Sequence, residues 1–271
     1  MKLFPKSNLK ILSNMKSIHT YVINLKTSEV RRRYMEDLLR SYNCIEFEFI
    51  DAVDGRKLSE QELLGQFDMS ASLKRYGREL NRGEIGCVLS HRKVFENFLK
   101  TDFPYALVFE DDISIIQDLN KLDGVDVDSN LDTPIPTIMF LSGDFWYYKK
   151  ETSVVPCYDA LGAYAYMLNR AAAQLLLSYQ KPYFVADDWC LHKRKGLKLK
   201  AIKPYMVDAN LQMDILSSDI QQYQWGINRT RMSIGELMSS IVRSGIKRTL
   251  KALGLFEAKS RVIDGKVVDD N

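Results

Sequence analysis

Three successive carboxylates, Glu110, Asp111 and Asp112, directly follow the apolar run YALVF. Such a run is typical of a central strand covered on both faces, and ligands of open α/β sheets bind beyond the carboxyl ends of the strands. Clustered carboxylates repel one another unless a cation or water neutralises them. Oxygen ligands favour Mg²⁺ or Mn²⁺, which keep open positions for phosphate oxygens. The run therefore predicts a divalent metal site, with a solvated surface turn as the alternative.

A second acidic pair, Asp187 and Asp188, precedes Trp189, whose ring is suited to stacking on a sugar face. An aspartate that accepts the proton of an attacking hydroxyl contributes about 10²–10⁴ in rate as a general base. The alternative is a helix N-cap with a solvated neighbour. The sequence leaves open which aspartate has which role.

His91 follows Ser90 on a predicted helix that leads into the acidic strand. From there it is expected to reach a phosphate or the metal, although a hydrogen-bonded core histidine is the commoner role of a lone histidine. His19, His91 and His192 show no metal-ligand spacing of the HExxH kind. His192 is left without a role.

Composition sets limits on the class of protein. The chain has 271 residues, of which 46% are hydrophobic, so it can bury a full core. A net charge of +3, from 38 basic and 35 acidic residues, gives no reason to expect nucleic acid binding. The motifs GxGxxG, GxxxxGK[ST] and GxSxG do not occur where dinucleotide binding, phosphoryl transfer or hydrolase chemistry would need them.

Cysteine spacing and hydropathy predict a cytoplasmic protein. The four cysteines are widely separated without a CxxC pair, which favours free thiols in a reducing compartment. They are Cys44, Cys87, Cys157 and Cys190. No apolar run approaches the ~20 residues of a membrane span, and the first residues lack the pattern of a signal peptide.

Strand and helix patterns alternate, which predicts an α/β fold with a mostly parallel, doubly wound sheet. Ser59 with Glu62, and Asn81 with Glu84, have the spacing of capping boxes. Strands are expected at 18–25, 44–51, 105–109, 137–141, 163–168 and 199–202, and helices at 28–42, after 59, 81–100 and 170–179.

The chain divides into three predicted parts: an N-terminal extension (1–16), an α/β domain (17–225) and a basic amphipathic C-terminal region (226–271). Apolar residues interleaved with Arg and Lys predict a helical appendage in the third part. Packing on the domain and attachment to an anionic membrane surface are equally open for this region.

Eight blocks occur in an order typical of one enzyme family. They are VINLKTSEVRRR (22–33), DAVDG (51–55), NRGEIGCVLSHRKVF (81–95), ALVFEDD (106–112), GAYAYMLNRAAAQLL (162–176), ADDW (186–189), KPYMVD (203–208) and SSDI (217–220). With these blocks the chain resembles the glycosyltransferase family 25 proteins, bacterial lipooligosaccharide galactosyl- and glucosyltransferases related to collagen galactosyltransferases. Departures are modest: Asn81-Arg82 precedes GEIGC, and Phe109 precedes EDD, where other residues are more usual.

The resemblance implies a GT-A fold and an inverting, metal-dependent transfer of galactose, or alternatively glucose, from a UDP-sugar to a lipooligosaccharide or LPS acceptor. The cofactor would be Mn²⁺ or Mg²⁺, held by Asp112 and Glu110 in a DXD-type motif. Asp188 or Asp187 would be the catalytic base. Donor binding would involve Asn24, Leu25, Arg31, Glu84, Ser90, His91, Glu110 and Asp111. The acceptor would place the protein at the cytoplasmic face of the bacterial inner membrane.

Two other function classes have related signatures. A sugar nucleotidyltransferase also holds magnesium with acidic residues on an α/β sheet, but it is expected to carry a glycine-rich loop after its first strand, and VINLKTSEVRRR has no glycine. A non-catalytic glycan-binding relative would share most motifs. A broken acidic run would be its best sign, and this run is intact.

Overall fold

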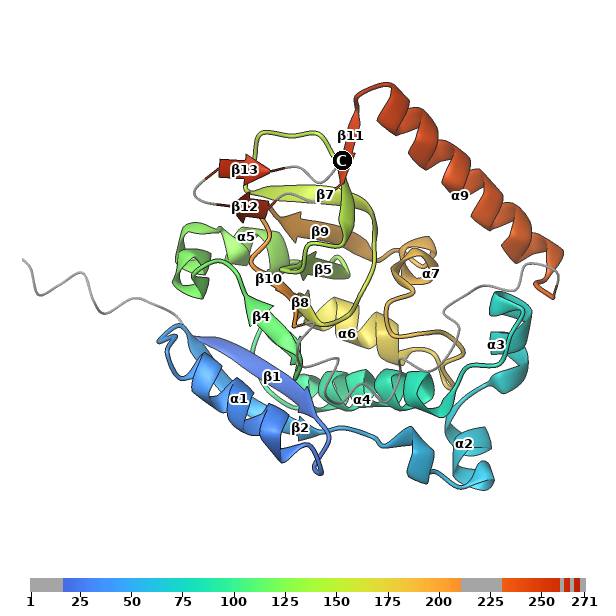
Figure 1. Ribbon diagram of the computed structural model, residues 1–271. Helices are drawn as coiled ribbons and strands as arrows, with labels where there is room; N and C mark the ends of the chain where they lie inside the picture. Colours follow the sequence, from blue (N-terminus) through green and yellow to red (C-terminus); the bar gives the residue numbers. More distant parts are fainter. Residues whose placement is uncertain (1–16, 211–230, 259–260, 264–265, 269–271) are drawn as a thin grey trace, which may run out of the picture.

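The computed structural model describes residues 17–210, 231–258, 261–263 and 266–268, and its centre is a nine-stranded sheet with helices on both faces (Figure 1). The strand order is β11-β6-β7-β9-β5-β8-β3-β1-β2. The strands are β1 (Ile18–Asn24), β2 (Ile45–Asp51), β3 (Tyr105–Glu110), β5 (Thr137–Phe140), β6 (Phe145–Tyr148), β7 (Val154–Ala160), β8 (Ala165–Asn169), β9 (Lys198–Ile202) and β11 (Phe256–Ala258). Two short pairs stand apart: β4 (Ile113–Ile115) with β10 (Val207–Ala209), and β12 (Arg261–Ile263) with β13 (Lys266–Val268).

The helices are named in chain order. They are α1 (Glu29–Leu39), η1 (Gly55–Lys57), α2 (Glu60–Gln66), α3 (Met69–Tyr76), α4 (Arg82–Leu99), η2 (Leu119–Gly124), α5 (Val127–Leu131), α6 (Arg170–Leu177), α7 (Trp189–Arg194) and α9 (Ile234–Ala252). Both predicted capping boxes are present, at Ser59 with Glu62 and at Asn81 with Glu84. Asn169 is the N-cap of α6, the helix predicted at 170–179.

Alternate residues of the central strands enter two separate cores, because successive side chains of a strand point to opposite faces. On β3, Ala106 and Val108 pack on one face with α4 and α6, while Leu107 and Phe109 pack on the other face with α1, η2 and α5. Residues 105–109 are all buried, as expected of a strand covered on both faces.

The first half of the chain creates a crevice between β1 and β3. Strand β1 pairs in parallel with both β2 and β3. The connection from β1 to β2 places α1 on one face, and the connection from β2 to β3 places α4 on the other. The winding therefore reverses between β1 and β3, and this switch point, at the carboxyl ends of the strands, is where ligands of such folds bind.

The predicted α/β class is confirmed, and β2, β1, β3, β5 and β9 share one direction. Strand β8 runs antiparallel between β3 and β5, and β7 is antiparallel to β9, so antiparallel strands stand within the sheet that was predicted as mostly parallel. Hydrophobic periodicity predicts strands but not their direction, which explains the difference.

The C-terminal region contains the predicted helix, α9, which packs at the edge of the domain (Figure 1). The chain then returns as β11, which pairs antiparallel with β6 and extends the large sheet. This strand was not predicted. The N-terminal extension and the SSDI block lie outside the described residues. In the described part of the chain, no helix combines the length and apolar character needed to cross a membrane.

Candidate functional site

A pocket of about 620 Å³ lies at the carboxyl ends of β1 and β3, within the volume range usual for small-molecule sites. Its wall comes from the segments after β1 and β2, from α1 and α2, from the first turns of α4 and from the acidic run. The predicted site residues in this wall are Leu25, Arg31, Ser90, Glu110, Asp111 and Asp112. Asn24, Glu84, His91, Asp187 and Asp188 are not among the described lining residues, and the first three are buried.

The acidic run divides its side chains between different partners. Asp111 is buried and accepts hydrogen bonds from Asn24 Nδ2 at 2.6 Å and Arg31 Nη1 at 2.9 Å. The same Arg31 nitrogen lies 3.1 Å from Asp112 Oδ2. Burial raises the pKa of Asp111 above its usual value, although Arg31 and Asn24 act in the opposite direction. Asn24 and Arg31, both predicted at the nucleotide, thus also fix the acidic run in place.

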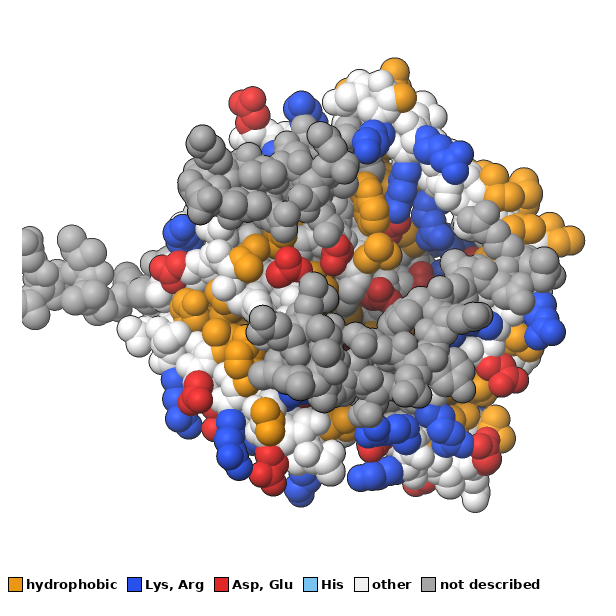
Figure 2. Space-filling view, in the orientation of Figure 1, with side chains coloured by type: hydrophobic (Ala, Val, Ile, Leu, Met, Phe, Trp, Pro, Cys, Tyr) orange, Lys and Arg blue, Asp and Glu red, His pale blue; other side chains and the backbone are white. Residues whose placement is uncertain are grey.

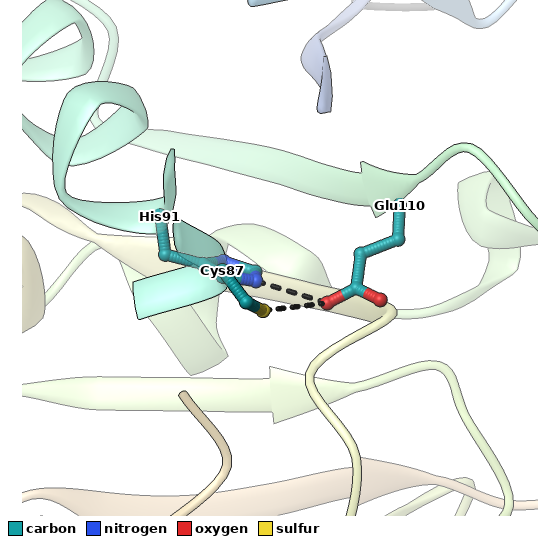
Figure 3. Close-up of side chains that lie close together, drawn as sticks. All are labelled: Cys87, His91 and Glu110. Atoms are coloured by element: carbon teal, nitrogen blue, oxygen red, sulfur yellow. Dashed lines mark hydrogen bonds and ion pairs between the residues drawn. The ribbon is translucent and has the colours of Figure 1, made fainter. Parts of the chain in front are cut away.

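Glu110 points instead toward α4, where it meets two side chains one helical turn apart (Figure 3). Its Oε1 lies 3.0 Å from His91 Nε2 and 3.7 Å from Cys87 Sγ. His91 is buried, and its Nδ1 lies 2.8 Å from the Tyr166 hydroxyl. Desolvation raises the pKa of the Cys87 thiol well above its usual value, and the Glu110 charge adds to this effect.

The charges of the acidic run are compatible with a divalent cation. When ionised, Glu110, Asp111 and Asp112 carry three negative charges, and the guanidinium of Arg31 supplies one positive charge among them. Two negative charges remain for this group of four side chains. Glu110 and Asp112 both line the pocket, and carboxylate oxygens are the ligands that Mg²⁺ and Mn²⁺ prefer.

Glu84 has a structural role at the start of α4. Its carboxylate accepts a hydrogen bond from the backbone N–H of Asn81 at 2.8 Å and pairs with Arg78 at 2.6 Å. The contact with Asn81 completes the capping box, and a typical N-cap contributes about 1 kcal/mol. Glu84 thus helps to hold the start of α4, where Asn81, Arg82 and Gly83 line the pocket, and its part in donor binding stays a prediction.

Ser90, Gly55 and Gly86 hold the loop that follows β2 in close contact with α4. The Ser90 hydroxyl accepts from the Val53 backbone N–H at 2.8 Å and donates to the Gly86 carbonyl at 2.7 Å. A Cβ on Gly86 would lie 2.5 Å from the Val53 carbonyl oxygen, and one on Gly55 would overlap the backbone of Arg82. The DG and GEIG segments of the sequence thus allow two backbones to touch, which shapes one wall of the pocket.

The two aspartates of the ADDW block differ in environment. Asp188 is the N-cap of α7 and forms a two-pronged ion pair with Arg75, whose Nη2 lies 2.7 Å from Oδ1; Tyr76 Oη lies 2.6 Å from Oδ2. Asp187 accepts from the Gly162 backbone N–H at 3.0 Å. Desolvation raises the pKa of Asp187, and the nearby charges of Asp188 and Glu110 add to the increase, whereas the Arg75 contacts lower the pKa of Asp188.

Trp189 does not present a stacking surface, so that prediction is wrong. The side chain is 1% exposed and packs edge-on against Phe140 and Tyr166. Its indole N–H donates to the Gly162 carbonyl at 2.9 Å. Trp189 is thus joined through Gly162 to Asp187, because the backbone N–H of Gly162 donates to the Asp187 carboxylate.

Comparison with known proteins adds to this geometry. Residues 17–191 match the model of glycosyltransferase family 25, described as LPS biosynthesis proteins. This chain belongs to glycosyltransferase family 25. The matched range contains the pocket wall, the acidic run and the ADDW block, so the family 25 domain coincides with the structure that forms the candidate site.

Individual relatives of this family 25 chain match over shorter stretches. A protein of Haemophilus influenzae named as a glycosyltransferase is 33% identical over 108 residues, which is 40% of this chain and 37% of that protein. Procollagen galactosyltransferase 1-A of Xenopus laevis is 33% identical over 108 residues, 38% of this chain and 17% of that protein. The crystal structure of HddC from Yersinia pseudotuberculosis covers 70% of this chain and 72% of its own at 14% identity, with a TM-score of 0.29 that is too low to establish a shared fold.

Sequence reasoning missed two residues of the site, Cys87 and Tyr166. Cys87 was interpreted only as one of four thiols of a reducing compartment, and none of these cysteines forms a disulfide in the described structure. The spacing of four between Cys87 and His91 would have placed both on one face of the predicted helix. Tyr166 comes from β8, and its contact with His91 depends on the strand order, for which no local sequence signal exists.

Proposed function

We propose that this family 25 protein transfers a hexose, galactose or alternatively glucose, from a UDP-sugar to a hydroxyl of a lipooligosaccharide or LPS glycan, with inversion at the anomeric carbon. The observation that carries the proposal is the pocket at the β1–β3 switch point, whose wall includes the acidic run. A sugar donor bearing a diphosphate needs such a crevice, together with groups that balance its charge.

The donor diphosphate is expected beside the first turn of α4. Asn81, Arg82 and Gly83 at this end of the 18-residue helix line the pocket. The unsatisfied N–H groups and positive dipole end of a helix favour phosphate. Arg31 and Leu25 would then flank the nucleotide, while Asn24 would act indirectly by holding Asp111.

Asp112 and Glu110 would hold Mn²⁺ or Mg²⁺ at the pocket wall. Such an ion, when bound, stabilises the negative charge that develops on the leaving diphosphate. Arg31 supplies part of the same stabilisation from the protein, because its guanidinium lies between Asp111 and Asp112. Asp111, enclosed by Asn24 and Arg31, orients that guanidinium.

Asp187 is the better candidate of the two for the base. It carries no ion pair with Arg75, and a raised pKa makes it a stronger base than an ordinary aspartate. In the proposed step the acceptor oxygen attacks the anomeric carbon from the face opposite UDP. The hydroxyl proton passes to Asp187 as the new C–O bond forms, and the bond to the diphosphate breaks with its electron pair leaving on UDP.

Calorimetric titration of UDP with and without Mn²⁺ tests this function, followed by turnover of a panel of UDP-sugars. We expect UDP to bind at least ten times more tightly with Mn²⁺ present, and Asp112→Asn to remove most of that gain. Leu64→Asn on exposed α2 is the matched control. Metal-independent UDP binding without turnover would favour a non-catalytic relative, and conversion of a nucleoside triphosphate with a sugar phosphate would favour a nucleotidyltransferase; either result would overturn the proposal.

We also propose that α9 attaches the protein to anionic membrane. Its inner face is held by ion pairs of Glu236 with Arg75 at 2.9 Å and of Lys247 with Asp159. Hydrophobic side chains gather along its outer edge (Figure 2). These exposed residues are Ile234, Met238, Ile241, Val242, Ile246 and Leu253, and Arg248 and Lys251 are exposed beside them. Such a face suits the interface of an acidic bilayer.

Ile241→Asp combined with Val242→Asp tests this attachment in sedimentation with vesicles containing anionic lipid. We expect binding to fall at least tenfold, because burial of each such side chain contributes about 1.5–3 kcal/mol. Leu64→Asp, at an exposed leucine of α2, is expected to leave vesicle binding unchanged. Equal binding by all three proteins would show that α9 does not face the membrane.

A further inference from the structure

The contact of Cys87, His91 and Glu110 has the features of a metal site of a different class. Cys87 and His91 are four residues apart on α4, so they occupy one face of the helix. Glu110 at the end of β3 approaches that face (Figure 3). Among the described residues, this is the one group of three potential ligand side chains whose donor atoms all lie within 4.8 Å of one another.

Two of the three separations between ligand atoms are close to those of a tetrahedral ion. Zinc bonds of about 2.0–2.1 Å to nitrogen and oxygen and 2.3 Å to sulfur imply ligand separations of about 3.4 Å for N···O and 3.6 Å for S···O. The observed separations are 3.0 Å between His91 Nε2 and Glu110 Oε1, and 3.7 Å between Cys87 Sγ and the same oxygen. These two separations lie within a few tenths of an ångström of the tetrahedral values, and the third, between the ligand atoms of Cys87 and His91, is within 4.8 Å.

We propose that Cys87, His91 and Glu110 form a three-ligand site for a thiophilic divalent cation, with Zn²⁺ as the preferred ion, at the floor of the pocket. A thiolate and an imidazole select zinc-like ions, whereas Mg²⁺ and Mn²⁺ are matched to oxygen ligands. Cys87 and Glu110 line the pocket, so the fourth position of the ion opens toward it. The fourth ligand would be water or a bound molecule.

Tyr166 completes the site as a partner of the histidine. Its buried hydroxyl lies 2.8 Å from His91 Nδ1 and holds the ring in its present orientation. With the ion on Nε2, the imidazole proton resides on Nδ1 and is donated to the Tyr166 oxygen. A hydrogen bond of this kind to the remote nitrogen orients ligating histidines, and its loss typically costs 10–100-fold in metal affinity.

Binding of zinc does not depend on the proposed function, but its consequence does. Glu110 is shared with the oxygen-ligand site proposed for Mn²⁺ or Mg²⁺. If the protein transfers sugar as proposed, occupation by Zn²⁺ withdraws Glu110 from that site and inhibits turnover. Through Cys87, His91 and Glu110, turnover would thus depend on whether Zn²⁺ or an oxygen-preferring ion such as Mn²⁺ is available.

Co²⁺ provides a spectroscopic test in the full-length, metal-free protein without donor. We expect one Co²⁺ per chain, a thiolate-to-cobalt charge-transfer band, and displacement of the band by Zn²⁺. Cys87→Ser should abolish the band, and Tyr166→Phe should weaken Zn²⁺ binding 10–100-fold. Cys190→Ser is the matched control, because Cys190 lies outside the cluster with its Sγ against Asp159.

A Co²⁺ spectrum without a thiolate band, or a band that survives Cys87→Ser, would overturn the proposal. If Cys87→Ser does not fold, alkylation of the wild-type protein followed by mass spectrometry decides instead. Zn²⁺ should then slow modification of Cys87 at least tenfold relative to Cys190, and unchanged modification would count against the site. These measurements contain no sugar nucleotide. A failure of UDP binding or of turnover would therefore contradict the proposed function and leave the zinc site intact.

Discussion

Asp187→Asn is expected to lower kcat for sugar transfer by about 10²–10⁴, with KM for the donor changed much less. The amide keeps the shape of the side chain but cannot accept the acceptor proton. The Gly162 N–H can still donate to its oxygen, so the protein should remain folded. Steady-state kinetics with a glycan acceptor measures the effect, and the thermal unfolding midpoint of each variant checks the fold.

The pH dependence of kcat gives a second measure of the same role. Desolvation, reinforced by Asp188 and Glu110, raises the pKa of Asp187, and a base acts in its deprotonated form. Activity should therefore rise with pH through an acid limb that lies above ~3.9, the ordinary aspartate value. Asp187→Asn should lack this limb. A variant that keeps wild-type kcat and its acid limb would remove Asp187 from the mechanism.

Local features of this chain were predictable because their physics is local. The capping boxes at Ser59 and Asn81 depend on residues three apart and were found where predicted. The buried strand 105–109 also needs only its own apolar run to be recognised. Family membership follows from ordered motifs, and the match over residues 17–191 confirms it.

The division of labour within the site depends on contacts between distant segments. Asp187 and Asp188 are adjacent in sequence, yet Asp188 meets Arg75, 113 residues earlier, whereas Asp187 meets Gly162. Trp189 is buried by β5 and β8, an arrangement that no local pattern specifies. The directions of the strands, and the identity of the side chains that surround the acidic run, could therefore be determined only from the folded structure.

Asp188→Asn is expected to lower the free energy of unfolding by about 1–3 kcal/mol, because it removes the two-pronged partner of the buried Arg75 and leaves this guanidinium with the Glu236 ion pair alone. The side chains of Arg75 and Asp188 are only 6% and 9% exposed, so water cannot replace the lost partner. Urea unfolding measures the difference. Asp187→Asn is the matched control, and it should cost far less because it removes a buried charge that has no ion pair with Arg75.

The pH dependence of stability should separate the two aspartates by sign. The folded-state pKa of Asp188 is lowered by Arg75, so its contribution is complete above the unfolded value of ~3.9 and is lost as pH falls through the folded pKa. Asp187 has a raised pKa, so its ionisation reduces stability as pH rises through that value. In Asp188→Asn the free energy of unfolding should therefore no longer fall in acid through this group. In Asp187→Asn that acid-dependent loss should remain. If Asp188→Asn is as stable as the wild type but has no turnover, the proposed roles are exchanged. Asp188 would then be needed for catalysis, and Arg75 would not need its carboxylate for stability.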